Sequence, residues 1–94
     1  MYYNGEFFFR AWSVRAYNIL RKARMQVNDA EDALAFADYL VNMGFPWGGG
    51  KKTAIEFYRA GGMGIYAIHD RVGGDLQRIR NLCEIYDYTL HQEI

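Results

Sequence analysis

The chain has 94 residues and no net charge, because 11 lysines and arginines balance 11 aspartates and glutamates. Half of it is hydrophobic and 17% is aromatic, which excludes an intrinsically disordered chain and predicts one domain, residues 1–94, around a single core. Zero net charge also removes the general electrostatic attraction that draws basic proteins to nucleic acids or anionic membranes.

The cysteine content and the N-terminal sequence indicate a cytoplasmic protein. Cys83 is the single cysteine, so no internal disulfide can form, and a reducing compartment is the simplest setting. The N-terminus has no basic segment ahead of a long apolar one, and therefore does not resemble a signal peptide. No uncharged apolar run approaches the length needed to cross a bilayer.

Aromatic residues dominate the first nine positions: Tyr2, Tyr3, Phe7, Phe8 and Phe9. Three consecutive phenylalanines cannot all face one way on a helix or a strand. We expect most of these side chains to enter the core, with an extra strand near Phe7 as one possibility. The alternative is that they form an exposed interface through which the chain makes a homodimer.

A first helix is predicted from residue 12, because apolar residues recur there at helical spacing. The predicted buried face consists of Trp12, Ala16, Ile19, Leu20 and Ala23. The opposite face carries Tyr17, Arg21, Lys22 and Arg24, and residues 10–24 contain five basic residues and no acidic one. Two interpretations stay open: a contact surface for a nucleic acid or an acidic partner, or a solvated face whose cations suit the negative end of the helix dipole.

Residues 28–47 predict the helix around which the chain is organised. Asn28 and Glu31 match a capping box, Gly44 follows as a left-handed C-cap with Phe45 folding back, and Pro46 prevents continuation. The predicted buried face is Ala33, Phe36, Ala37, Leu40 and Val41. The outer face carries Glu31, Asp32, Asp38 and Asn42, which is either an acidic partner-binding surface or a solvated face.

The second half of the sequence is typical of a sheet. Residues 48–52 predict a flexible glycine loop, residues 54–58 and 63–69 predict two strands of a hairpin, and residues 84–90 predict a third strand. A short helix capped by Asp75 is expected between the last two strands. The expected fold is therefore α+β, with a small antiparallel sheet of three to four strands, two main helices and a short third helix packed on it.

The glycine-rich segments do not match nucleotide-binding motifs in the required context. Gly50-Lys51 is followed by Lys52 rather than the Ser or Thr of a P-loop. Residues 62–67 match G-x-G-x-x-[GA], but the expected strand that follows is the wrong context for a dinucleotide site. His69 and His91 are far apart, without a second ligand at metal-binding spacing. We therefore expect no cofactor, no metal and no catalytic activity.

A further candidate binding site combines basic and aromatic residues. Trp47, Lys51 and Lys52 flank the glycine loop, and such a combination can hold a nucleic-acid strand by charge and stacking. The alternative is a solubilising loop with Trp47 folded onto the helix end.

The run A-E-D-A-L-A-F-A-D-Y-L-V-N-M-G-F-P-W-G-G-G-K resembles a pattern of small phage-encoded α/β accessory or anti-defence proteins. In that pattern an acidic helix ends in Leu-x-x-x-Gly-aromatic-x-Trp before a glycine loop and a sheet. The resemblance covers about a quarter of the chain and implies binding to a host factor, including host defence nucleases, rather than catalysis.

Three functional hypotheses follow. The first is a non-enzymatic binding protein, a phage-type inhibitor of a host protein or ribonucleoprotein complex such as a CRISPR effector nuclease, which places it in the host cytoplasm. The second is a nucleic-acid-binding accessory module, and the third a self-associating structural protein. The candidate partner-binding residues are Trp47, Lys51, Lys52, Tyr17, Arg21, Lys22, Arg24, Glu31 and Asp38.

Overall fold

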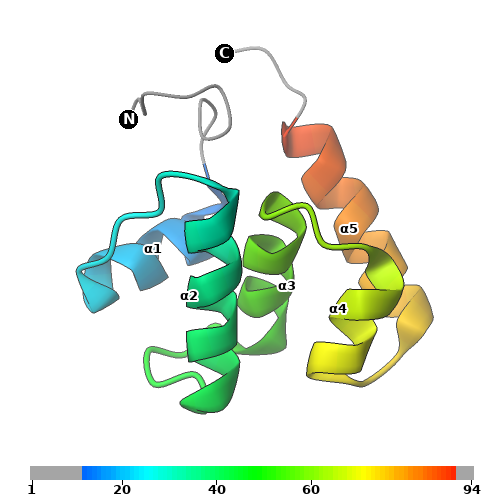
Figure 1. Cartoon of the computed structure of the whole chain (residues 1–94), viewed down its shortest axis with the longest axis horizontal. Helices are drawn as coiled ribbons and strands as arrows, with labels where there is room; N and C mark the ends of the chain where they lie inside the picture. The colour runs from blue at the N-terminus through cyan, green and yellow to red at the C-terminus, as the bar shows by residue number, and fades with distance from the viewer. Residues whose placement is uncertain (1–11, 91–94) are drawn as a thin grey trace.

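The computed structural model describes residues 12–90 of the chain, with side chains for residues 12–88 (Figure 1). These residues form five α-helices and no strand: α1 (Val14–Ala23), α2 (Ala30–Asn42), α3 (Gly50–Ala60), α4 (Ile65–Val72) and α5 (Leu76–Leu90). The prediction of an α+β fold with a sheet is therefore wrong, and the fold is all-α. The predicted contribution of Tyr2, Tyr3 and Phe7–Phe9 lies outside the described residues.

Helix α3 occupies the centre of the bundle. It packs against α1, α2, α4 and α5, and every residue from Thr53 to Tyr58 is buried. Figure 1 shows α3 between α2 on one side and the α4–α5 pair on the other. A helix with neighbours on several sides is apolar around most of its circumference, and this explains why the A-I-E-F-Y run has a single charged residue, Glu56. The organising helix is thus α3 rather than the predicted helix at residues 28–47.

The three predicted strands are wrong, because each of these segments is helical. Residues 54–58 form a short apolar run, which periodicity alone cannot assign to a strand or a buried helix. In α4 the buried residues are Ile68 and Val72, which are four residues apart as on one face of a helix. In α5 the buried residues Ile79, Cys83 and Tyr86 recur at helical spacing, so the helix expected after Asp75 continues through the third predicted strand.

Helix α2 confirms the predicted helix and moves its start by one residue. The N-cap is Asp29, whose carboxylate accepts a hydrogen bond of 2.8 Å from the Asp32 amide, and the Asp32 carboxylate accepts one of 3.1 Å from the Asn28 amide. This reciprocal pair replaces the predicted box of Asn28 and Glu31. The predicted inner face is confirmed for Ala33, Phe36, Ala37 and Leu40, which are buried, and Val41 is partly buried against them.

The end of α2 is also confirmed. Gly44 has a left-handed φ of 72°. The Phe45 amide donates to the Leu40 carbonyl at 2.9 Å and the Gly44 amide to the Val41 carbonyl at 3.2 Å. This pair of bonds is a Schellman motif, and Phe45 packs against the core beside it.

A buried carboxylate joins α1 to α3. Glu56 is only 6% exposed, and its two oxygens accept hydrogen bonds from the Ser13 amide at 3.0 Å and the Ser13 hydroxyl at 2.6 Å. The same hydroxyl accepts from the Ala16 amide at 3.1 Å and so caps α1. Trp12 lies in the adjacent core with its ring 4.9 Å from Phe57. Glu56 therefore fixes where α1 begins relative to α3.

None of the described helices is both long enough and apolar enough to span a membrane.

The close packing of α2 and α3 depends on Gly61. A Cβ at this position would lie 2.6 Å from Leu34 side-chain carbons and 3.0 Å from the Ala30 carbonyl oxygen. We predict that Gly61→Ala lowers the free energy of unfolding by about 1–3 kcal/mol through overpacking. Urea denaturation measures this, and in a Leu34→Ala background the cost should be smaller because the main clash is gone. Equal costs in both backgrounds would contradict a steric contact between Gly61 and Leu34.

Candidate partner-binding surfaces

Most buried polar groups of the described residues serve the packing of the helices. The Arg15 guanidinium donates to the Thr53 hydroxyl at 3.0 Å and to the Tyr86 hydroxyl at 3.1 Å. Tyr86 in turn donates to the Lys52 carbonyl at 3.1 Å, so one network joins α1, α3 and α5. Burial raises the pKa of Tyr86 and the nearby Glu56 carboxylate acts in the same direction. These hydrogen-bonded groups therefore hold the helices together.

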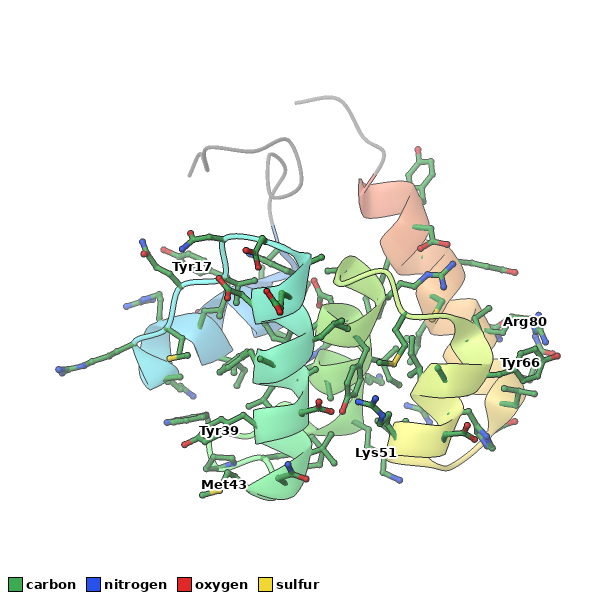
Figure 2. The ribbon with its side chains drawn as sticks, viewed as in Figure 1. Tyr17, Tyr39, Met43, Lys51, Tyr66 and Arg80 are labelled. Carbon is green, nitrogen blue, oxygen red and sulfur yellow. The ribbon has the colours of Figure 1, made fainter. Side chains whose placement is uncertain are left out.

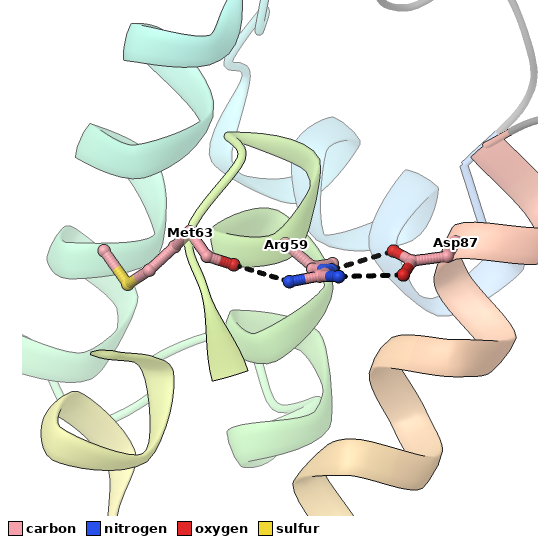
Figure 3. A network of polar contacts seen from close by, with 3 residues as sticks. All are labelled: Arg59, Met63 and Asp87. Carbon is pink, nitrogen blue, oxygen red and sulfur yellow. Dashed lines mark hydrogen bonds and ion pairs between the residues drawn. The ribbon is translucent and has the colours of Figure 1, made fainter. Parts of the chain in front are cut away.

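A second tie holds α3 against α5 (Figure 3). The Arg59 guanidinium forms two hydrogen bonds of 2.8 Å with the Asp87 carboxylate and one of 3.0 Å with the Met63 carbonyl. The hydrogen-bonded Asp87 raises the pKa of Arg59, so the ion pair stays charged. Such a bidentate geometry is the strongest form of this ion pair, and it fixes the second half of α5 on α3.

Asp38, predicted to lie on an acidic binding face, is engaged inside the molecule. Its carboxylate accepts a hydrogen bond of 2.5 Å from the Tyr58 hydroxyl and one of 2.8 Å from the Arg71 guanidinium. Arg71 also lies 5.7 Å from the centre of the Tyr58 ring. Asp38 therefore connects α2 to α3 and α4, whereas Glu31, the other predicted acidic residue, is exposed.

The predicted basic residues of α1 stay together on one exposed face. Tyr17, Arg21, Lys22 and Arg24 are all exposed, and the Arg21 guanidinium lies 5.8 Å from the Tyr17 ring centre. Arg24 ends the helix in a left-handed conformation with φ of 57°. No opposite charge from the described residues is paired with this face, so it remains available to a partner.

The residues of the predicted glycine loop take different positions. Lys51 and Lys52 belong to the first turn of α3 and are exposed there, rather than to a flexible loop tip. Trp47 is half-buried, and its ring lies 5.9 Å from the ring of Tyr39 on α2. The lysines instead border a hollow that also includes Arg78 of α5, a residue the sequence analysis did not select.

A further surface, which we call the α2 apolar face, consists of Met25, Tyr39, Met43 and Trp47. Met25, Tyr39 and Met43 are 48%, 44% and 55% exposed. Tyr39, stacked on Phe36, also borders a groove of about 240 Å³ between α2 and the α1–α2 connection, and Met25 borders it on the other side. Figure 2 shows Tyr39 and Met43 projecting from the same side of α2.

The spacing of residues in the sequence could have predicted this face. Tyr39 and Met43 are four residues apart, and both fall outside the apolar stripe that packs α2 into the core. Large apolar residues at such off-stripe positions are candidates for an interface. The sequence analysis assigned the outer side of this helix by its carboxylates alone and so missed them.

His69 and Cys83 do not form a nucleophile and base pair in the described residues. The His69 Nε2 is 2.9 Å from the Gly74 carbonyl, and Cys83 is buried, which raises its thiol pKa. Among residues 12–90 no three histidine, cysteine or carboxylate side chains are grouped as metal ligands.

Comparisons of this chain with protein-family models, with curated proteins and with solved structures found no match.

Tyr58 gives the fold a specific alkaline sensitivity. Burial and the hydrogen bond to Asp38 raise its pKa from 10.0 to about 12, against a smaller opposing effect of Arg71. Between these values the folded chain holds a proton that the unfolded chain has lost, so stability falls as the pH rises from 10 to 12. The two-unit shift corresponds to about 3 kcal/mol.

We predict that Tyr58→Phe costs about 2 kcal/mol at pH 7, because the hydrogen bond to the Asp38 carboxylate is lost. The variant should also lose stability less steeply than the wild type above pH 10. Urea denaturation of both proteins at pH 7, 9, 10 and 11 measures the difference, and the other titrating groups cancel between them. Parallel curves at every pH would contradict the assignment.

Proposed function

We propose that this chain is a small non-enzymatic binding protein that docks on another protein through the α2 apolar face. The observation that carries the proposal is the exposure of Tyr39 and Met43 beside an apolar groove. Aromatic residues and methionine are enriched at the centres of protein interfaces, and an apolar patch bordered by polar residues is typical of a docking surface.

The polar rim around this face supports the same proposal. Glu31 and Asp32 are exposed at the start of α2, and Asp32 also borders the groove. The face thus combines an apolar centre with an acidic margin, which suits a partner whose own apolar patch has basic residues at its edge. Tyr39 is held between Phe36 and Trp47, so little side-chain freedom is lost when a partner binds.

The specific form of the proposal is a phage-type inhibitor of a host complex such as a CRISPR effector nuclease. It is supported by the resemblance of residues 30–51 to the acidic helix and glycine segment of small phage accessory proteins, although the sheet of that pattern is absent from residues 12–90, and by the structural use of most buried polar groups described above. A protein of this size can block a large complex by covering one functional surface, without any chemistry of its own.

The test uses purified CRISPR effector complexes of several types in a DNA-cleavage assay with a molar excess of the chain. We predict inhibition of one type, and a loss of at least about tenfold in inhibitory potency for Tyr39→Ser/Met43→Ser, as expected for interface anchors. The control is Tyr66→Ser, which removes an exposed aromatic from α4. Circular dichroism must show that both variants fold.

Two results would contradict the proposal. Inhibition by the double variant equal to that of the wild type would show that the α2 apolar face is not the contact. Absence of both inhibition of any effector and co-elution with it in size-exclusion chromatography would remove the effector as the partner. Sedimentation of the chain alone is expected to show a monomer, and a dimer that Tyr39→Ser/Met43→Ser dissolves would assign this face to self-association instead.

A further inference from the structure

A hollow of about 490 Å³ opens between the start of α3 and the connection from α4 to α5. Its lining comes from two distant parts of the sequence and is rich in glycine and basic residues: Gly49, Gly50, Lys51, Lys52, Gly73, Gly74, Asp75, Arg78 and Ile79. Its lining places the hollow where α3 and α5 begin, and Figure 2 shows Lys51 at this end of the molecule.

The basic groups of this hollow have no acidic partner among residues 12–90. The ion pairs in that part of the chain are Arg59–Asp87 and Arg71–Asp38, and neither involves Lys51, Lys52 or Arg78. The one carboxylate in the lining, Asp75, accepts a hydrogen bond of 3.1 Å from the Gln77 amide at the start of α5. Three cations therefore converge on the hollow, where they repel one another.

The position of these cations is also unfavourable for the helices that carry them. The first turn of a helix favours acidic residues, because the helix dipole is positive there. Helix α2 follows this rule with Glu31 and Asp32 in its first turn, whereas the other four described helices have no acid there. Helix α3 departs furthest from the rule, because its first turn has two lysines, Lys51 and Lys52, and no side-chain cap from Gly49.

Local rules are broken in proteins mainly where function requires it. Unpaired cations around a hollow are stabilised when an anion enters it, and the wall opposite the lysines combines Arg78, Asp75 and Ile79 with the backbone of Gly73 and Gly74. Gly73 and Gly74 have positive φ values of 71° and 88°, and no side chain projects from them into the opening. A ligand with repeated negative charges on a slender chain fits these features.

We propose that this hollow binds the phosphodiester backbone of a single-stranded nucleic acid. The site goes beyond the protein docking proposed above and uses none of the residues of the α2 apolar face. Adjacent phosphates along a single strand can approach Lys51, Lys52 and Arg78 in turn. A duplex requires an extended basic face, whereas this cluster is small and recessed, so the single strand is favoured.

The chain's zero net charge limits the affinity to this local attraction. Three phosphate contacts predict that the binding constant falls with about the second power of the salt concentration, following the counterion release of single strands. A rise from 50 to 150 mM NaCl should then weaken binding roughly tenfold. Binding that depends on hydrophobic contact would not show this slope.

The experiment measures fluorescence anisotropy of a labelled 20-nucleotide single-stranded DNA, with the matching duplex and an RNA of the same sequence as separate arms. The variant is Lys51→Glu/Lys52→Glu. The matched control is Arg21→Glu/Lys22→Glu, which changes the net charge by the same amount on exposed residues of α1. We expect the first variant to lose at least about tenfold in affinity and the control less than about threefold, because only the first removes contacts in the hollow.

Arg78→Gln, on the other side of the hollow, should weaken binding severalfold with a smaller salt dependence. Equal losses in Lys51→Glu/Lys52→Glu and the α1 control would overturn the proposal, since the attraction would then be general. Absence of binding to single strands at 25 mM NaCl, equal or tighter binding to the duplex, or equally tight binding to polyglutamate would also overturn it.

Thermal denaturation provides a readout that a purely structural role would not give. Replacing the two lysines by glutamate corrects the charge at the start of α3, so the melting temperature should rise by about 4 °C while nucleic-acid binding is lost. A fall in melting temperature would show that the lysines stabilise the fold and would overturn the proposal. Because Tyr39 and Met43 are unchanged, inhibition through the α2 apolar face can persist when this site fails, and the two proposals are tested separately.

Discussion

The burial of α3 on every side is the constraint from which the rest of the structure follows. The residues of α3 from Thr53 to Tyr58 are buried by the four neighbouring helices, so each polar side chain among them needs a partner from one of these helices. Glu56 receives Ser13 of α1, and Thr53 receives Arg15 of the same helix. The Tyr58 hydroxyl donates to the Asp38 carboxylate of α2. These pairs fix the position of each neighbour as specifically as the apolar contacts do.

The same requirement explains why most polar residues within the bundle are engaged with one another. Arg59 is committed to Asp87 and to the Met63 carbonyl, and Asp38 is committed to Tyr58 and Arg71. Removing one partner of such a pair leaves a buried or half-buried charge without compensation, so these residues are constrained by the fold. The residues that are free to vary for function lie on the surface of α1, on the outer side of α2 and at the ends of the helices.

Helices α1 and α2, which each have one exposed and one buried side, were predictable from the sequence, whereas α3, α4 and the end of α5 were not. In α2, polar residues alternate with the stripe of Phe36, Ala37 and Leu40 at helical spacing, and its Gly44 terminus is recognisable from local chemistry alone. In α3, Ile55, Phe57 and Tyr58 are all buried, so the run has no period to read. Its β-branched and aromatic residues favour a strand locally, and only the surrounding helices override that preference. The segments that form α4 and the last turns of α5 have an alternation and a composition typical of strands, so local pattern favours a strand there too.

The candidate sites also differ in whether the sequence alone could predict them. Tyr17, Arg21 and Lys22 are exposed together because the amphipathic pattern of α1 already separated them from its buried face. The hollow of Lys51, Lys52 and Arg78 could not be predicted, because it exists only when α3 and α5 begin at the same end of the bundle. For Asp38 the reverse holds. Helical periodicity places its carboxylate on the outer face of α2, but it is a structural residue because α4 places Arg71 within ion-pair distance of it.

The two proposed surfaces lie at the same end of the molecule, so one partner can contact both. Tyr39 and Met43 on α2 and Lys51 on α3 all lie towards the end of the molecule where α2 finishes and α3 begins (Figure 2). A partner made of protein alone would leave the unpaired cations of the hollow unused, and a nucleic acid alone would leave the apolar face exposed. A ribonucleoprotein complex offers both an apolar protein surface and a phosphodiester strand, and engaging two modest sites at once gives an affinity that neither provides separately. A small neutral protein can in this way select such a complex over free nucleic acid and over its protein subunits.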